Sequence, residues 1–354
     1  MLRDIEKKDL ESLLDQGAVL SDSNSLWLFW GDSHSQSVRP AGPAIFEMPF
    51  FSEAHIQWRV YENVARLTMN VARALFPFNK SILPQVKWQP ADRDLFSQQF
   101  AWVKNQIQDA GIKKLVPYTL EKGSMSSIGP EQREAFIGRA LTFSQGYLYG
   151  RWEGEKGYIG RTPEVLIEQS SPTEFSTMAL AGTVPLSEYE LNPNSFEKDP
   201  KQSDEHQWVV DDIANVLSHF GDVHVSERKV AKTPSLAHLQ TNIKLVSRQS
   251  LDLESLIIQL HPTPALGAYP REKGLAALKQ LDGVLSRDEL GAPFGLSFNP
   301  NKALVLVGIR KLQWEHNNIQ IASGCGVVQS SELESEWQEL MAKRNSVKNL
   351  FGVQ

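Results

Sequence analysis

Glu205 is a candidate ligand for a cation. It lies four residues before Val209 and continues the apolar face of a helix predicted over 203–220. A carboxylate on a buried face is unfavourable unless a cation or metal compensates its charge. Glu205 also lies in the first turn of that helix, where acidic residues are favoured by the helix dipole and often stay solvated. Its spacing leaves both interpretations open.

A second set of charged residues follows helical spacing near the C-terminus. Glu336, Glu339 and Lys343 share one face of a helix predicted over 332–351. The Glu339–Lys343 spacing is also typical of an exposed, weakly stabilising ion pair. Two carboxylates from separate helices, with no Cys or His pattern beside them, would suit a hard cation such as Mg²⁺.

Three short segments bring backbone or an imidazole into restricted positions. The glycines of 180–183 and 322–327 can expose backbone N–H groups to a carboxylate, and they can equally form turns. His261 opens the sequence HPTPA, whose two prolines would hold its ring in a fixed orientation. A lone histidine is more often a structural hydrogen-bonding residue than a catalyst. No phosphate-binding loop, dinucleotide fingerprint or zinc-protease motif is present.

Composition excludes several classes of protein. The chain has 36 Lys and Arg against 42 Asp and Glu, a net charge of −6, which disfavours a non-specific nucleic-acid or anionic membrane surface. Its one cysteine, Cys325, allows neither an internal disulfide nor a Cys/His zinc site of the usual type. Residues 1–15 lack the apolar region of a secretory signal, and no apolar stretch is long enough to span a membrane. We expect a cytoplasmic protein.

The order of the predicted elements indicates an α+β fold. Strand-like runs follow one another over 145–185, as in an antiparallel sheet, instead of alternating with helices. We divide the chain into residues 1–90, an N-terminal part without an assignable site, and residues 91–354, the catalytic region. The other predicted elements are helices over 92–110, 203–220, 253–260 and 332–351, and a hairpin of strands 304–314 and 319–322 turned by Asn317-Asn318.

Taken in order, several segments resemble the chorismate-utilising enzymes, among them isochorismate synthase, salicylate synthase and anthranilate synthase component I. The resemblance covers about 110–354 and implies one large α+β fold, with antiparallel sheets flanked by helices and the active site in a central cleft. The matching segments are 113–116, 160–164, 180–183, 204–210, 260–271, 308–310, 324–327 and 336–339.

The resemblance implies an acid/base pair. Lys114 matches the lysine that acts as the general base on water, and Glu164 matches the general acid beside the leaving 4-hydroxyl of chorismate. Lys114 must be neutral and Glu164 protonated to act, and burial favours both states. Ammonia-using members of the family typically lack this lysine, so Lys114 indicates a water-using enzyme.

It also implies the binding residues. Glu205 and Glu339 match ligands of Mg²⁺, and Glu336 matches a residue that reaches the metal through water. The stretch 198–204 before Glu205 is longer than the family's usual link. The residues matched to substrate binding are Arg310, Lys343 and Gly324 for the carboxylates, and Gly182, Thr183 and His261 around the ring.

The resemblance therefore predicts a Mg²⁺-dependent isochorismate synthase, with menaquinone biosynthesis as the first pathway to consider. The alternatives are a salicylate synthase, an isochorismate synthase of a siderophore pathway, and a non-catalytic relative that binds chorismate. The family's water-using members are usually monomers, so we expect a monomer without a glutamine amidotransferase partner.

Overall fold

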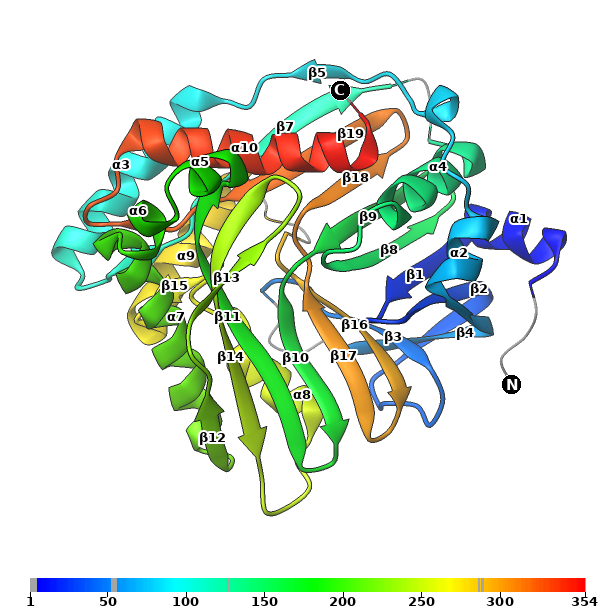
Figure 1. The fold of residues 1–354 in the computed structure, drawn as a ribbon, viewed down its shortest axis with the longest axis horizontal. Coiled ribbons are helices and arrows are strands. Elements are labelled where there is room, and N and C mark those ends of the chain that lie inside the picture. Colours follow the sequence, from blue (N-terminus) through cyan, green and yellow to red (C-terminus); the bar gives the residue numbers. More distant parts are fainter. Residues whose placement is uncertain (1–4, 52–55, 126–127, 286, 288–289, 354) are drawn as a thin grey trace.

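The structure, a computed structural model, describes residues 5–51, 56–125, 128–285, 287 and 290–353. Within these residues, 17 strands form one continuous antiparallel sheet, and helices lie on its faces (Figure 1). This confirms the predicted α+β class.

The pairing order shows how the sheet is assembled from distant segments. Strands from the first 90 residues pair with much later ones, so the N-terminal part is built into the same sheet; the boundary near residue 90 stays a prediction. From one edge to the other the strands are β5 (Lys87–Gln89), β7 (Tyr118–Ser124), β19 (Asn318–Gly324), β18 (Lys311–Glu315), β9 (Lys156–Thr162), β8 (Tyr147–Glu153), β1 (Gln16–Ser21), β2 (Ser25–Gln36), β4 (Gln57–Thr68), β3 (Ala44–Glu47), β16 (Pro293–Asn299), β17 (Lys302–Val307), β10 (Val165–Ser171), β11 (Glu174–Pro185) and β14 (Leu236–Val246), with β12 (Asp222–Val225) and β13 (Lys229–Lys232) both paired to β14.

A second, three-stranded sheet holds Lys114. Its central strand β6 (Lys114–Leu115) lies between β15 (Ala268–Tyr269) and β20 (Val327–Val328). Buried Arg287 supports this sheet, because its guanidinium donates to the carbonyl oxygens of Val116 at 2.7 Å and Leu266 at 2.8 Å. Lys114 is thereby fixed between segments more than 150 residues away in the sequence.

The helices cover the sheet through separate apolar cores. Two of them, α7 and α10, carry the acidic residues singled out above. None of the described helices is long and apolar enough to cross a membrane. The helices are α1 (Lys7–Asp15), α2 (Met69–Leu75), α3 (Arg93–Asp109), α4 (Pro130–Leu141), α5 (Leu186–Leu191), α6 (Pro193–Glu197), α7 (Pro200–Ser218), α8 (Leu253–Leu260), α9 (Arg271–Leu285) and α10 (Leu333–Phe351), with a short 3₁₀ turn at Lys80–Ile82.

The helices predicted from periodicity are confirmed, with α7 shifted toward the N-terminus. α3, α8 and α10 lie within one residue of their predicted limits, but α7 begins three residues and ends two residues earlier than predicted. The side chain of Asp199 accepts a hydrogen bond from the Gln202 amide at 3.2 Å, and Pro200 occupies the first helical position. Local capping, which periodicity does not detect, therefore places residue 201 inside the helix.

The predicted strand over 304–314 is wrong in one respect: it is two strands, β17 and β18. Residues 308–310 between them are not in a strand, and Arg310 has a left-handed backbone conformation with φ of 56°. The predicted hairpin of β18 and β19 is confirmed, but its turn is His316-Asn317, since Glu315 pairs with Asn318.

Buried Arg344 fixes α10 on the sheet. Its guanidinium donates to the hydroxyls of Thr119 at 2.6 Å and Ser323 at 2.8 Å, and it lies 3.4 Å from the Glu121 carboxylate. These partners belong to β7 and β19, so one side chain ties the helix to both strands. The position of Glu336 and Glu339 depends on this attachment.

We predict that Arg344→Met lowers the free energy of unfolding by about 2–4 kcal/mol, because it leaves buried hydrogen-bonding groups without their charged partner. Urea denaturation of the purified protein measures the change. The matched control is Arg93→Met, which removes an exposed contact of 2.5 Å between α3 and Glu334 of α10 and should change stability by less than about 1 kcal/mol. Equal effects of the two substitutions would contradict the role assigned to Arg344.

Candidate active site

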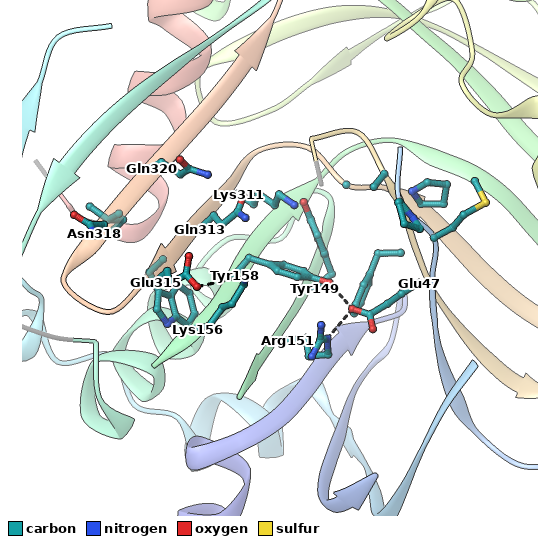
Figure 2. A pocket seen from close by; sticks show the side chains of 18 of the residues that line it. Glu47, Tyr149, Arg151, Lys156, Tyr158, Lys311, Gln313, Glu315, Asn318 and Gln320 are labelled. Carbon is teal, nitrogen blue, oxygen red and sulfur yellow. Dashed lines mark hydrogen bonds and ion pairs between the residues drawn. The ribbon is translucent and has the colours of Figure 1, made fainter. Parts of the chain in front are cut away.

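One wide hollow of the molecule does not hold the predicted chemistry. It has a volume of about 890 Å³ and lies over β8, β9 and β18 (Figure 2). Its carboxylate at Glu47 is neutralised within the hollow by Arg151 at 2.7 Å and by a hydrogen bond from the Tyr158 hydroxyl at 2.8 Å. None of the residues predicted as site residues lines it.

Most of the predicted site residues meet instead around a smaller pocket of about 60 Å³, room for a few water molecules. Lys114 and Glu336 do not line the pocket. Lys114 contacts Glu205, and Glu205 does line it. The predicted residues that line it are Glu164, Gly182, Thr183, Glu205, Arg310, Gly324, Glu339 and Lys343.

His261 is not brought to this pocket. Its Nε2 lies 2.9 Å from the Phe50 carbonyl oxygen, and burial lowers its pKa to about 3, so the ring is a neutral donor to the backbone. The environment of His261 therefore agrees with the alternative that it is a structural hydrogen-bonding residue.

His238 lines the pocket, and sequence reasoning missed it. Its Nδ1 lies 3.0 Å from the Thr183 hydroxyl, and its buried Nε2 has no hydrogen-bond partner among the residues that the structure describes. Burial lowers its pKa well below the usual value, and the nearby cations Arg310 and Lys343 add to this effect. His238 pairs directly with Thr183 in the β11–β14 ladder. Recognising that β14 begins at Leu236 would have pointed to it, because the strand places His238 opposite Thr183.

Glu164 has the properties of a general acid. It is buried in the connection between β9 and β10, where its amide donates to the Thr162 hydroxyl at 3.2 Å and its carbonyl accepts from the Val307 amide at 3.1 Å. Burial raises its pKa to about 7, against the opposing effect of Lys114, Arg310 and Lys343. A substantial fraction of Glu164 is therefore protonated at neutral pH.

Arg310 supplies a cation on a strained backbone. The carbonyl of Arg310 accepts a hydrogen bond from the Arg161 amide at 3.1 Å, which holds its left-handed conformation in place. Burial lowers its pKa to about 10, while the carboxylates of Glu339 and Glu164 oppose the shift. Arg310 thus stays charged at neutral pH.

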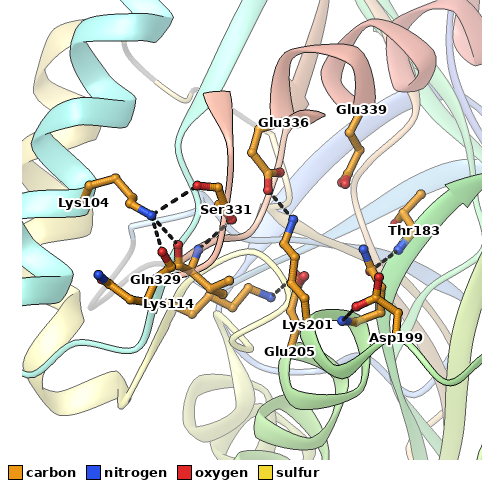
Figure 3. Close-up of polar contacts among 12 residues, drawn as sticks. Lys104, Lys114, Thr183, Asp199, Lys201, Glu205, Gln329, Ser331, Glu336 and Glu339 are labelled. Atoms are coloured by element: carbon orange, nitrogen blue, oxygen red, sulfur yellow. Dashed lines mark hydrogen bonds and ion pairs between the residues drawn. The ribbon is translucent and has the colours of Figure 1, made fainter. Parts of the chain in front are cut away.

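Lys114 is fully buried, and its Nζ lies 2.8 Å from Oε1 of Glu205 without the alignment of a hydrogen bond (Figure 3). Gly326 makes this contact possible. A Cβ at that position would lie 2.1 Å from Oε1 of Glu205 and 2.5 Å from Cε of Lys114. The glycine-rich segment therefore provides room for the ion pair.

The two carboxylates of α10 are also paired with lysines. Lys343 Nζ lies 2.6 Å from Glu339 and donates to the Gly324 carbonyl at 2.7 Å. Lys201 Nζ lies 2.5 Å from Oε1 of Glu336 (Figure 3). Among the described residues, no three Asp, Glu, His or Cys side chains are close enough together to share a metal ion in this arrangement.

The arrangement suits proton transfer to a small polyanion. Glu164 provides an acid that is partly protonated at neutral pH, and Arg310 and Lys343 provide cations on the same pocket. Such a combination can bind negative groups while it holds a proton ready for transfer.

Solved structures of similar shape are isochorismate and anthranilate synthases. A protein from Bacillus anthracis assigned as a 2,3-dihydroxybenzoate-specific isochorismate synthase, DhbC, superposes with a TM-score of 0.82 at 20% identity, covering 99% of this chain and 100% of that one. The menaquinone-specific isochorismate synthase MenF from Escherichia coli superposes with a TM-score of 0.77 at 17% identity, over 99% and 92% of the two chains. At these identities the similarity shows the fold.

Sequence comparison finds isochorismate synthases as well. MenF of Bacillus subtilis is 29% identical over 268 residues, which are 74% of this chain and 56% of that protein. EntC of E. coli K12 is 27% identical over 201 residues, 55% of this chain and 51% of that protein. The chain thus spans about half the length of the curated relatives it matches.

A family model described as "Chorismate binding enzyme" matches residues 53–352, most of the chain, including every predicted site residue. The chain belongs to the chorismate-binding enzyme family.

Proposed function

We propose that this protein is an isochorismate synthase, which interconverts chorismate and isochorismate. The observation that carries the proposal is Glu164: a buried carboxyl with a pKa near 7, within electrostatic range of Lys114 and on the same pocket as Arg310. A binding protein for a dianion has no need of a protonated carboxyl at this place. The names of the relatives from B. subtilis and E. coli support the same activity.

Binding follows from charge. Chorismate carries two carboxylates, and the pocket offers Arg310 and Lys343 beside the backbone of Gly324. An arginine can clamp a carboxylate through two parallel hydrogen bonds, which fixes the orientation of the ring as well as binding it. Thr183 and His238 extend the polar lining on the opposite strand pair.

Lys114 and Glu164 then act at two different carbon atoms of the chorismate ring. Lys114, in its neutral form, accepts a proton from water as the water oxygen bonds to ring carbon 2. Glu164 donates its proton to the 4-hydroxyl as the bond between carbon 4 and oxygen breaks, and the ring double bonds shift between the two positions. Water is consumed and released, so the reaction is a reversible isomerisation.

Mg²⁺ fits the donor set of the site. Glu205, Glu339 and Glu336 offer the carboxylate oxygens that this ion prefers, and the ammonium of Lys201 already lies against Glu336 as a cation. Glu205 and Glu339 would hold the ion, with Glu336 acting through water. When bound, Mg²⁺ would supply positive charge for the ring carboxylate.

The wider assignment is also part of the proposal. We place the enzyme in menaquinone biosynthesis, as a cytoplasmic monomer that works without a glutamine amidotransferase. Residues 1–90 complete the catalytic fold, as the pairing of β1 with β8 and of β3 with β16 supports.

The direct test is product analysis of the purified protein with chorismate, with and without Mg²⁺. We expect isochorismate in equilibrium with chorismate only when Mg²⁺ is present. Salicylate with pyruvate would instead identify a salicylate synthase, and unchanged chorismate would reject catalysis.

Replacing Lys114 should separate catalysis from binding. We predict that Lys114→Met lowers kcat by about 10²–10⁴-fold, because no other group accepts the proton of the attacking water. Chorismate affinity, measured by calorimetry with Mg²⁺ present, should change far less. Lys348→Met is the control, since Lys348 pairs with Glu121 at 2.7 Å outside the pocket. Turnover of Lys114→Met at the wild-type rate would eliminate Lys114 as the base.

The raised pKa of Glu164 has a consequence for stability. Between pH 4.5 and about 7 the folded protein keeps a proton on Glu164 that the unfolded chain releases, so the free energy of unfolding falls as pH rises through this window. Glu164→Gln lacks this titration. We predict that its stability relative to wild type rises by about 3 kcal/mol from pH 4.5 to pH 7, measured by urea denaturation at each pH. A difference that does not change with pH would contradict the assigned protonation state.

A further inference from the structure

Lys201 is a cation placed among the proposed metal ligands by the start of α7. Asp199 caps this helix, so Lys201 lies in its first turn and Glu205 lies one turn later on the same face. The side chain reaches across to α10, where its Nζ lies 2.5 Å from Glu336 (Figure 3). One lysine thus links the two helices that carry the carboxylates.

Glu336 depends on this lysine for compensation. Its side chain is only 1% exposed, and burial together with the neighbouring charge of Glu339 raises its pKa, while Lys201 acts in the opposite sense. A carboxylate this deeply buried is strongly destabilising without a cation.

The carboxylates of Glu205 and Glu339 also affect the pKa of Lys201. Glu336, Glu205 and Glu339 all act to raise its pKa, against the effect of burial. The contact at 2.5 Å with Glu336 places this ammonium, from the helix that also carries Glu205, against one of the three glutamates. A divalent ion that uses Glu336 would have to replace the ammonium there.

We propose that Lys201 is a built-in counter-cation that holds the metal position of this protein, and that Mg²⁺ binds by displacing it from Glu336. This inference rests on the proposed function, because it takes the three glutamates to be the ligands of the ion.

A solvent-accessible space lies beside Lys201 and can receive its displaced side chain. Lys201 also lines an outer hollow of about 700 Å³, bounded by α5, α6 and α10, and its side chain is 19% exposed. This hollow shares Thr183 and Glu339 with the inner pocket, so the two spaces meet at these two residues, and Lys201 lies on the outer side. A modest rotation of the side chain would move the ammonium from buried carboxylates into solvent, where its hydration replaces the lost ion pair.

The exchange also limits the change in the net charge of the site. The three carboxylates have three lysine partners, Lys114, Lys201 and Lys343, in the absence of metal. One Mg²⁺ that replaces one ammonium would add a single positive charge, and this charge would compensate Glu205 when Lys114 is neutral. The protein should accordingly fold stably without the ion.

Direct titration of Mg²⁺ into the full-length protein, without chorismate, tests the exchange. Lys201→Met removes the charge but keeps most of the side-chain volume, so we expect calorimetry to give at least tenfold tighter Mg²⁺ binding than in wild type. The control is Lys348→Met, which breaks an ion pair of similar burial between α10 and Glu121, and should leave the affinity within twofold. Unchanged or weaker binding in Lys201→Met would overturn the proposal.

Thermal unfolding gives a second readout. Without metal, Lys201→Met should melt below wild type because Glu336 has lost its partner, and added Mg²⁺ should raise its Tm by more than it raises that of wild type. Equal increments in the two proteins would contradict the exchange. If Lys201→Met does not fold without metal, the same comparison is made with Lys201→Gln.

The outcomes separate this inference from the proposed function. Isochorismate formation together with unchanged Mg²⁺ affinity in Lys201→Met would overturn the exchange alone. Tighter binding in a protein that leaves chorismate untouched would support the exchange and reject the catalytic assignment. Failure of both wild type and Lys201→Met to bind Mg²⁺ would overturn the exchange and the metal ligands together.

Discussion

The site is organised by the need to neutralise carboxylates that the fold removes from water. Glu205 and Glu336 are each less than a tenth exposed, and each lies against a lysine from a different element. An uncompensated charge at such depth would destabilise the fold by several kcal/mol, so the lysines are structural before they are functional. Lys343 is paired with Glu339 in the same way and also lines the pocket, so one lysine can serve both the stability of the fold and the proposed binding of a negative ligand.

The two sheets have different tasks in meeting this constraint. The large antiparallel sheet provides Thr183, the β9–β10 connection that holds Glu164, and the attachment of α10, while the small sheet around β6 presents Lys114 between two distant segments. Because Lys114 and Glu205 come from separate elements, their contact of 2.8 Å depends on the packing of α7 against the small sheet. A binding site assembled in this way forms only when most of the chain has folded.

The sequence alone predicted those parts of the site that depend on local pattern. Helical periodicity placed Glu205 and Glu339 on faces that turn inward, and resemblance added Lys114 and Glu164, which spacing could not identify. His238 was missed because its strand begins earlier than the apolar pattern indicated, and His261 was assigned to the ring although its donor is taken up by a backbone carbonyl. Lys201 could be seen one turn before Glu205, but its partner on α10 is 135 residues away and no local rule connects them.

Gly326 shows how closely the chemistry and the backbone are joined. With no side chain of its own, it lets the main chain of the segment before β20 lie directly against both Lys114 and Glu205. A single methyl group here would clash with both side chains and force the ion pair apart. The space at this position therefore requires glycine for a packing reason, whatever reaction the surrounding residues perform.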